Sequence, residues 1–379
     1  RWVAGIVAVG ISMVIIFPRI RRLSIKRNYE SPGDFINDRY NNKALCVLVT
    51  LCLCIPQLLY LAVQVYSLGA VLSNLTNGEL SFYWVIGVST ALILIFEFAG
   101  GMRSVAYTDA VQASVMIIVF LTIPIMLTVQ YGGFIGQVAD SEDLPCDNSN
   151  EQMTSGCLNY VTYQAEDGDG EADEYYLRSP SMLTTINYIL FTLSLLSFSL
   201  NPHVLQRTFA AQHDWQVKFV MKGIIIAAFV AMIPGILMGI TYLSNKSSFN
   251  EEYQNMKAFS AMLAVFKDQG GFVEFISYVA LLAGIAGIMS TADSSLIGVS
   301  NTMSCDIFQN WLTPNAQPKT IVYIGETVSF FTMLISVAIA IYINEAQLEY
   351  GVLLTLQQGI LWQAFPAYVF GLYTNIGTR

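Results

Sequence analysis

The feature that most constrains this chain is a series of long apolar segments, because a helix needs about 20 such residues to cross a lipid bilayer. Nine segments have this character, at residues 2–17, 45–68, 82–98, 105–127, 183–200, 219–242, 272–303, 320–343 and 351–373. The whole composition agrees, with 54% hydrophobic and 12% charged residues and a mean hydropathy of +0.54. The sequence therefore predicts an all-α, multi-pass membrane protein whose residues 1–379 form one transmembrane domain embedded in a lipid bilayer.

Charge in the loops indicates how these segments cross the membrane, since cytoplasmic loops are enriched in Lys and Arg. The loop after the first segment and its flanks carry Arg19, Arg21, Arg22, Lys26, Arg27, Arg39 and Lys43. Alternating from a cytoplasmic first loop places most of the 18 Lys and Arg inside. The two Asn-x-Ser/Thr glycosylation acceptors, Asn74 and Asn245, then lie outside. We expect a plasma-membrane protein. Because Arg1 opens directly onto an apolar segment, we also expect an excerpt of a longer chain.

An acidic insert at about residues 131–180 interrupts the pattern and holds much of the acid behind the net charge of −9. This topology places the insert outside, where its composition is typical of partly disordered segments. It could concentrate cations near an entrance, although a solvated insert is the simpler interpretation. Cys146 and Cys157 lie within it, and an oxidising exterior permits a disulfide between them.

Several classes of function lack their usual sequence signals. The six Cys and two His show no zinc-binding spacing, and there is neither a phosphate-binding loop nor a nucleophile triad. We therefore expect neither an enzyme nor a nucleic-acid partner.

One apolar segment carries a group of small and hydroxyl residues on one helix face. Gly287, Ser290 and Thr291 are spaced i, i+3 and i+4, which places them together on a helix. Their oxygens could bind a small hard cation such as sodium. Alternatively, the hydroxyls hydrogen-bond to the preceding turn, as is common in apolar helices. From these residues alone, the second interpretation is the simpler.

Amide and hydroxyl side chains also mark two other segments. In the fifth, Asn187, Ser194, Ser197 and Asn201 project within an arc of about 80° on an α-helix. In the last, polar amides recur at Gln357, Gln358 and Gln363. Such amides can bind carboxylate, amide or hydroxyl groups of a solute. The fifth-segment stripe could equally serve packing against a neighbouring helix.

Four segments together resemble the sodium:solute symporter family. Residues 98–112, FAGGMRSVAYTDAVQ, are similar to its Gly-Gly-x-x-x-Val-x-x-Thr-Asp-x-x-Gln signature. Residues 31–39, SPGDFINDR, resemble its first cytoplasmic loop, and 203–211, HVLQRTFAA, resemble its Gln-Arg-x-x-Ala-Ala loop. Residues 288–294, IMSTADS, resemble its ion-site helix. The resemblance covers nearly the whole chain apart from the acidic insert.

The resemblance implies an inverted repeat of two five-helix halves, with the nine segments as core helices two to ten and the first core helix before Arg1. It implies a sodium site made by the Gly287 carbonyl and the Ser290 and Thr291 hydroxyls. Asp109 matches an acid associated with sodium passage toward the cytoplasm, although capping of a helix start is an equal alternative. Asn201 matches a solute-contacting position of sugar-carrying members.

The function implied is secondary active transport of a small organic solute, with sodium as the coupling ion. The alternative is a solute-sensing receptor, in which the same membrane module is linked to a signalling domain. A channel fits the pattern less well, since polar residues are scattered and helices are broken. Neither the identity of the solute nor the oligomeric state is indicated.

Overall fold

The computed structural model describes residues 2–76, 78–131, 164–166, 172–174, 182–245, 249–250, 253, 256, 258–348 and 350–375. Contacts divide the chain into two compact units. The first, which we call unit 1, contains Arg1–Ala113, Thr185–Ala228 and Ile285–Arg379, and unit 2 contains Ser114–Thr184 and Phe229–Gly284.

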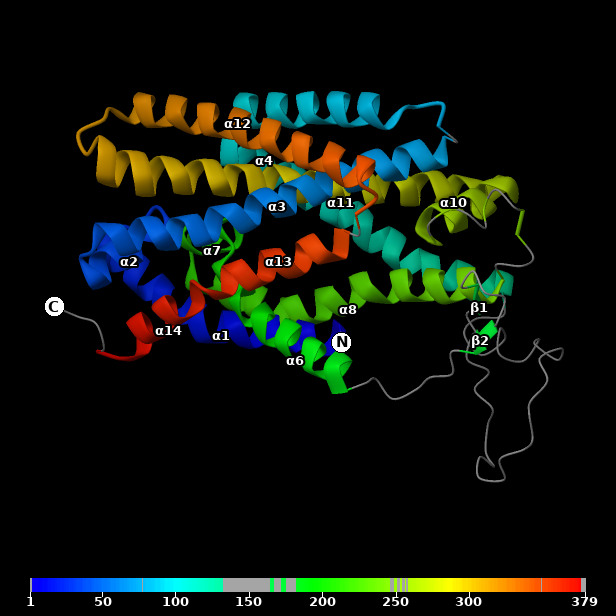
Figure 1. The fold of residues 1–379 in the computed structure, drawn as a ribbon, viewed down its shortest axis with the longest axis horizontal. Coiled ribbons are helices and arrows are strands. Elements are labelled where there is room, and N and C mark those ends of the chain that lie inside the picture. Colours follow the sequence, from blue (N-terminus) through cyan, green and yellow to red (C-terminus); the bar gives the residue numbers. More distant parts are fainter. Residues whose placement is uncertain are drawn as a thin grey trace, which may run out of the picture. The chain divides into compact units, whose positions relative to one another are not determined.

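Most of the helices belong to unit 1, and Figure 1 labels them along the chain. They are α1 (Trp2–Arg27), α2 (Pro32–Tyr40), α3 (Lys43–Leu75), α6 (Met182–Ser194), the 3₁₀ turn η1 (Leu195–Leu200), α7 (Pro202–Ala210), the π-helical η3 (Met303–Leu312), α12 (Pro318–Glu345), α13 (Tyr350–Trp362) and α14 (Phe365–Tyr373). Three long helices run from one unit into the other, namely α4 (Phe82–Tyr131), α8 (Asp214–Ser244) and α11 (Gly271–Thr302), and α6 also begins in unit 2, with Met182–Thr184. Unit 2 also contains α10 (Ala258–Asp268).

Seven helical stretches in the described residues are long and apolar enough to cross a membrane. They are Lys43–Leu75, Phe82–Gly101, Val105–Val129, Thr185–Ala210, Asp214–Tyr242, Gly271–Leu312 and Pro318–Glu345. They coincide with the second to eighth predicted segments. The first predicted segment forms α1, which continues into a basic end, and the ninth is divided into α13 and α14 near Pro366. Pro is favoured in the first turn of a helix, so Pro366 suits the start of α14.

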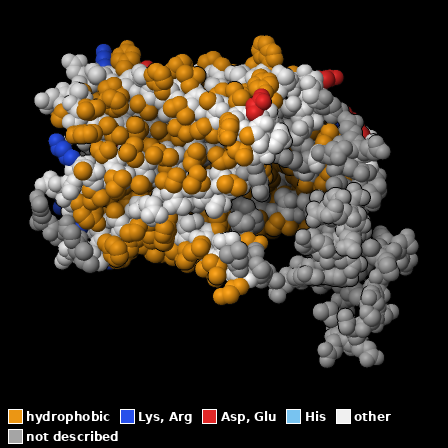
Figure 2. Space-filling view, viewed as in Figure 1, with side chains coloured by type: hydrophobic (Ala, Val, Ile, Leu, Met, Phe, Trp, Pro, Cys, Tyr) orange, Lys and Arg blue, Asp and Glu red, His pale blue; other side chains and the backbone are white. Residues whose placement is uncertain are grey.

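The surface of these helices is strongly apolar. Large side chains such as Trp84, Phe219 and Phe331 are more than half exposed. Figure 2 shows hydrophobic side chains over much of the described part of one face, with Lys and Arg at one margin of the view. Exposed apolar patches of this extent indicate a membrane or partner surface, so the predicted multi-pass membrane protein is confirmed.

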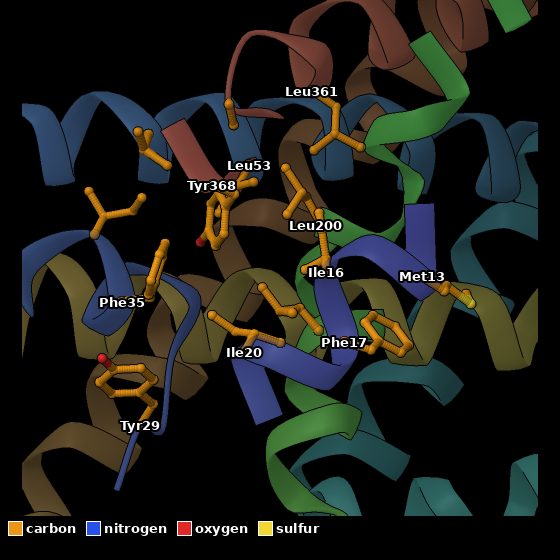
Figure 3. Close-up of a cluster of buried hydrophobic side chains, with 14 of the residues drawn as sticks. Met13, Ile16, Phe17, Ile20, Tyr29, Phe35, Leu53, Leu200, Leu361 and Tyr368 are labelled. Atoms are coloured by element: carbon orange, nitrogen blue, oxygen red, sulfur yellow. The ribbon is translucent and has the colours of Figure 1, made fainter. Parts of the chain in front are cut away.

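A core cluster in unit 1 joins helices that are far apart in the sequence (Figure 3). It includes Ile16 of α1, Phe35 of α2, Leu53 of α3, Leu361 of α13 and Tyr368 of α14, all at most 1% exposed. The rings of Phe35 and Tyr368 stack with centroids 5.4 Å apart. The Tyr368 hydroxyl also donates a hydrogen bond of 2.7 Å to the Pro32 carbonyl. Helix α2 is thus packed against α14.

Two breaks in the helices shape the candidate site. Gly101 has φ 56° and ψ −163°, which divides α4 into two helices and agrees with the two predicted segments on either side. Only glycine adopts such a backbone conformation readily. The second break lies at Asn201, which has φ −50° and ψ 127° between η1 and α7.

The acidic insert contributes one described feature, an antiparallel hairpin of β1 (Gln164–Glu166) and β2 (Ala172–Glu174). Cys146 and Cys157 lie outside the described residues, so their disulfide stays a prediction. The glycosylation acceptors Asn74 and Asn245 lie at the ends of α3 and α8, and their modification also stays a prediction.

Candidate ion and solute sites

Asp109 lies where the second part of α4 meets α11, and it organises a polar cluster in unit 1. Its Oδ1 accepts a hydrogen bond from the Ser290 hydroxyl. Its Oδ2 accepts a hydrogen bond of 3.3 Å from the Ser294 hydroxyl. Because Asp109 lies well inside the helix that follows Gly101, its carboxylate does not cap a helix start. The capping alternative is therefore wrong for this structure.

Arg207 of α7 completes the cluster. Its guanidinium forms an ion pair with Asp109 Oδ2 and donates a hydrogen bond of 2.6 Å to the Ser294 hydroxyl. The side chain of Asp109 is 13% exposed, whereas that of Arg207 is 54% exposed. A largely buried carboxylate is thus neutralised by a cation that extends from the surface. Sequence reasoning did not predict this pair.

Separate contacts fix the helix that carries Arg207. The Arg21 side chain of α1 donates to carbonyls at the end of α7, including Phe209 at 2.9 Å. Gln206 Nε2 donates to the Gly298 carbonyl at 3.1 Å and the Thr302 hydroxyl at 2.9 Å. A Cβ at Gly298 would lie 2.9 Å from the backbone nitrogen of His203. Because glycine has no Cβ, α7 and α11 can approach each other closely at this point.

The three predicted sodium ligands lie on α11, but their hydrogen bonds differ. The Thr291 hydroxyl donates 2.8 Å to the Gly287 carbonyl, which is the back-bonding arrangement considered above. The Ser290 hydroxyl instead donates to Asp109. Two proposed ligands, the Gly287 carbonyl and the Thr291 hydroxyl, are thus bonded to each other, whereas the Ser290 hydroxyl is bonded to the carboxylate.

Two buried carboxylates inside the predicted apolar segments were missed by the sequence reasoning. Asp293, on α11, is 4% exposed and its Oδ1 has no hydrogen-bond partner among the described residues. Glu97 Oε1 of α4 accepts a hydrogen bond of 2.5 Å from the Ser329 hydroxyl. The other oxygen, Oε2, has no partner among the described residues either. Both acids stand inside apolar segments, and this unusual position is the signal that could have singled them out.

The predicted polar stripe of the fifth segment does not form one α-helical face. Asn187 is exposed on α6, and the helix changes to 3₁₀ geometry at Leu195. Ser194 and Ser197 donate to carbonyls three residues earlier. Asn201, in contrast, is 1% exposed; its Nδ2 donates 2.8 Å to the Phe198 carbonyl.

Among the described residues, four amides have a buried carbonyl oxygen without a partner: Gln57, Gln112, Asn201 and Gln358. Gln57 lies on α3 and its Nε2 is 2.7 Å from His203 Nδ1. Gln358 lies on α13, which packs against α3 and η1. Gln357 is also buried, whereas Gln363 is exposed. Sequence reasoning selected Asn201, Gln357 and Gln358 but missed Gln57.

These features define a multi-pass helical membrane protein with a cluster of carboxylate and hydroxyl side chains between α4, α7 and α11. The family model "Sodium:solute symporter family" matches residues 2–376. The chain belongs to this family, and the resemblance proposed from its four motifs is confirmed.

Individual relatives agree with this assignment. The sodium/proline symporter of Salmonella typhimurium is 25% identical over 353 residues, covering 89% of this chain and 62% of the relative. The sodium/glucose cotransporter of Vibrio parahaemolyticus is 21% identical, covering 87% of this chain and 60% of the relative. The chain thus spans about three-fifths of the length of these two relatives.

A solved structure supports the fold. The substrate-bound, outward-open state of a Na⁺-coupled sialic acid symporter aligns with a TM-score of 0.69 and 16% identity, covering 98% of this chain and 72% of that one. At this identity the likeness concerns the fold alone, and it confirms the predicted sodium-symporter fold class.

Proposed function

We propose that this chain forms the transmembrane domain of a secondary active transporter that carries a small organic solute together with sodium. The observation that carries the proposal is the cluster of Asp109 with the hydroxyls of Ser290 and Ser294. A buried acid beside hydroxyl ligands is suited to a small hard cation. Family membership supports the same activity.

The sodium ion would bind to oxygens of α11. The Gly287 carbonyl and the Ser290 and Thr291 hydroxyls are the proposed ligands, and Asp109 would receive the ion on its way to the cytoplasm. One charge moving through about 70 mV releases roughly 1.6 kcal/mol, and a tenfold gradient adds about 1.4 kcal/mol. Each sodium could therefore drive roughly hundredfold accumulation of a solute.

The solute would interact with the buried amides. Asn201 Oδ1 and Gln358 Oε1 lack partners among the described residues, and leaving a buried acceptor unsatisfied costs about 1–3 kcal/mol. A solute with an N–H or O–H donor would recover this free energy. We therefore propose a solute that carries an amine, amide or hydroxyl group, with Gln357 as the alternative partner on α13.

Uptake by the full-length protein in proteoliposomes tests the proposal. Radiolabelled amino acids, sugars and polyols would be presented with an inward sodium gradient, and with sodium replaced by potassium as the control. We expect at least one solute to accumulate above its external concentration only with the sodium gradient. Binding without accumulation would instead support the receptor alternative, and equilibration without accumulation would support a channel.

A further inference from the structure

We infer that Arg207 is a tethered counter-ion that pairs with Asp109 when sodium is absent and competes with sodium for this carboxylate. The inference rests on the proposed sodium coupling and extends it to a residue outside the proposed ligand set. Arg207 thereby sets the sodium affinity and promotes release of the ion.

The geometry places three groups around one carboxylate. Ser290 donates to Asp109 Oδ1, while Arg207 and Ser294 both donate to Oδ2. Ser294 also accepts from Arg207 at 2.6 Å, so the guanidinium contacts the acid and its neighbouring hydroxyl. A sodium ion bound beside Asp109 would need these same oxygens. The guanidinium therefore occupies the position that an incoming cation requires.

Electrostatics make the two cations alternatives. Asp109 is largely buried, and an isolated charge inside a membrane protein is costly unless it is paired. The guanidinium supplies that pairing without sodium. When sodium approaches, two positive charges would share one carboxylate in a low-dielectric setting, where their repulsion is strong. Because half of the Arg207 side chain is exposed, it can withdraw into water at little cost.

Arg207 is not needed to hold its own helix. The end of α7 is fixed by Arg21 through backbone carbonyls, and Gln206 fixes α7 to α11 through Gly298 and Thr302. These contacts involve neither Arg207 nor Asp109. The guanidinium can therefore leave the carboxylate while α7 stays in place, as a competing group must.

The competition has a direction. In the proposed topology the end of the membrane segment that carries α7 and Arg207 faces the cytoplasm, so the guanidinium approaches Asp109 from the side where sodium is released. Once an ion departs, Arg207 would return to the carboxylate and oppose rebinding. Removing its charge should therefore strengthen sodium binding and slow turnover.

The test measures sodium binding to the purified full-length protein without any solute. Melting temperature is followed against sodium concentration, with N-methylglucamine chloride keeping the ionic strength constant. Arg207→Gln and Arg207→Met both remove the charge. Using both means that the test still works if one of them fails to fold. We expect the half-saturating sodium concentration to fall about tenfold in both, and to stay within about twofold of wild type in Arg207→Lys.

Two comparisons separate competition from a structural effect. Lys218→Gln removes an exposed positive charge on α8 and should leave half-saturation unchanged. In an Asp109→Asn background, Arg207→Gln should produce no further change, because the carboxylate for which the two cations compete is absent. A purely structural role would lower the melting temperature in sodium-free buffer without shifting half-saturation.

The outcomes distinguish the inference from the proposed function. If wild type responds to sodium and the neutral Arg207 variants bind it no more tightly, the inference is wrong while sodium coupling stands. An equal shift in the Asp109→Asn background would also overturn it. If sodium does not affect wild type, the proposed coupling fails, and the inference fails with it.

Discussion

Gly33 lies against the carboxylate of Asp306 so closely that a side chain at position 33 has no space. The Gly33 backbone nitrogen donates 3.0 Å to Asp306 Oδ2, and a Cβ there would lie 2.3 Å from Asp306 Cγ. The hydroxyls of Ser31 and Thr50 donate to the same carboxylate. Asp306, in η3 just beyond the end of α11, is thus held by the start of α2 and by α3.

This contact predicts that Gly33→Ala destabilises the protein. The added methyl group must displace Asp306 or α2, and such overpacking costs about 1–3 kcal/mol. Gly223→Ala is a matched control, because no atom lies within 4 Å of a Cβ at this helical glycine. Melting temperatures in detergent should fall for Gly33→Ala only. If Gly33→Ala lowered the melting temperature no more than Gly223→Ala does, the predicted clash with Asp306 would be contradicted.

A second prediction concerns the hydrogen bonds to Asp306. Asp306→Ala leaves the Ser31 and Thr50 hydroxyls and the Gly33 N–H without their buried acceptor, which costs at least about 1–3 kcal/mol. Ser31→Ala should cost less in wild type and almost nothing further in the Asp306→Ala background. Melting temperatures of the three variants measure this coupling. Additive losses would mean that the two residues act independently.

The positions of the membrane helices along the chain were largely predictable, because the length and hydropathy of each span depend only on its own residues. Hydropathy located the seven membrane-length stretches, including the two parts of α4 that the structure divides at Gly101. The 3₁₀ geometry of Leu195–Leu200 was not predicted. The stripe had been projected at a constant 100° per residue, an assumption that fails once the helix tightens before Asn201.

Long-range pairs could not be predicted, because nothing local records which helices meet. Asp109 and Ser290 are 181 residues apart, and the ion pair of Arg207 with Asp109 joins segments 98 residues apart. Each of these residues stood in a recognised motif, so the sequence supplied the members of the cluster. Only the packing of α4, α7 and α11 brings them together.

A third prediction tests the sodium ligands in uptake by the full-length protein. Ser290→Ala combined with Thr291→Val should raise the sodium concentration for half-maximal uptake about tenfold, since two oxygen ligands are lost. Solute affinity at saturating sodium should fall much less. Thr327→Val is the control, because Thr327 also bonds back to its own helix, at 2.8 Å from the Tyr323 carbonyl. If the double variant kept the sodium activation of wild type, neither hydroxyl would be a sodium ligand. The Thr291 hydroxyl would then serve only to hydrogen-bond the preceding turn of its helix.

The last prediction places the solute at the buried amides. Asn201→Ala and Gln358→Ala each remove a carbonyl oxygen that has no partner among the described residues. If a solute donor forms a hydrogen bond to that oxygen, losing the bond costs about 1–3 kcal/mol of binding free energy, or roughly ten- to hundredfold in affinity. Solute binding at saturating sodium should weaken by this factor, while surface expression and sodium affinity stay nearly unchanged.

Gln363→Ala serves as the matched control, because Gln363 is an exposed amide just beyond the end of α13 whose Nε2 donates to the Gly359 carbonyl. Its removal should not change solute affinity. Gln357→Ala should have the larger effect if α13 presents that neighbour to the solute instead of Gln358. Packing alone would give a different pattern, in which Asn201→Ala and Gln358→Ala lower the melting temperature and surface expression while the remaining protein binds solute with wild-type affinity. That result would remove both amides from the proposed solute site.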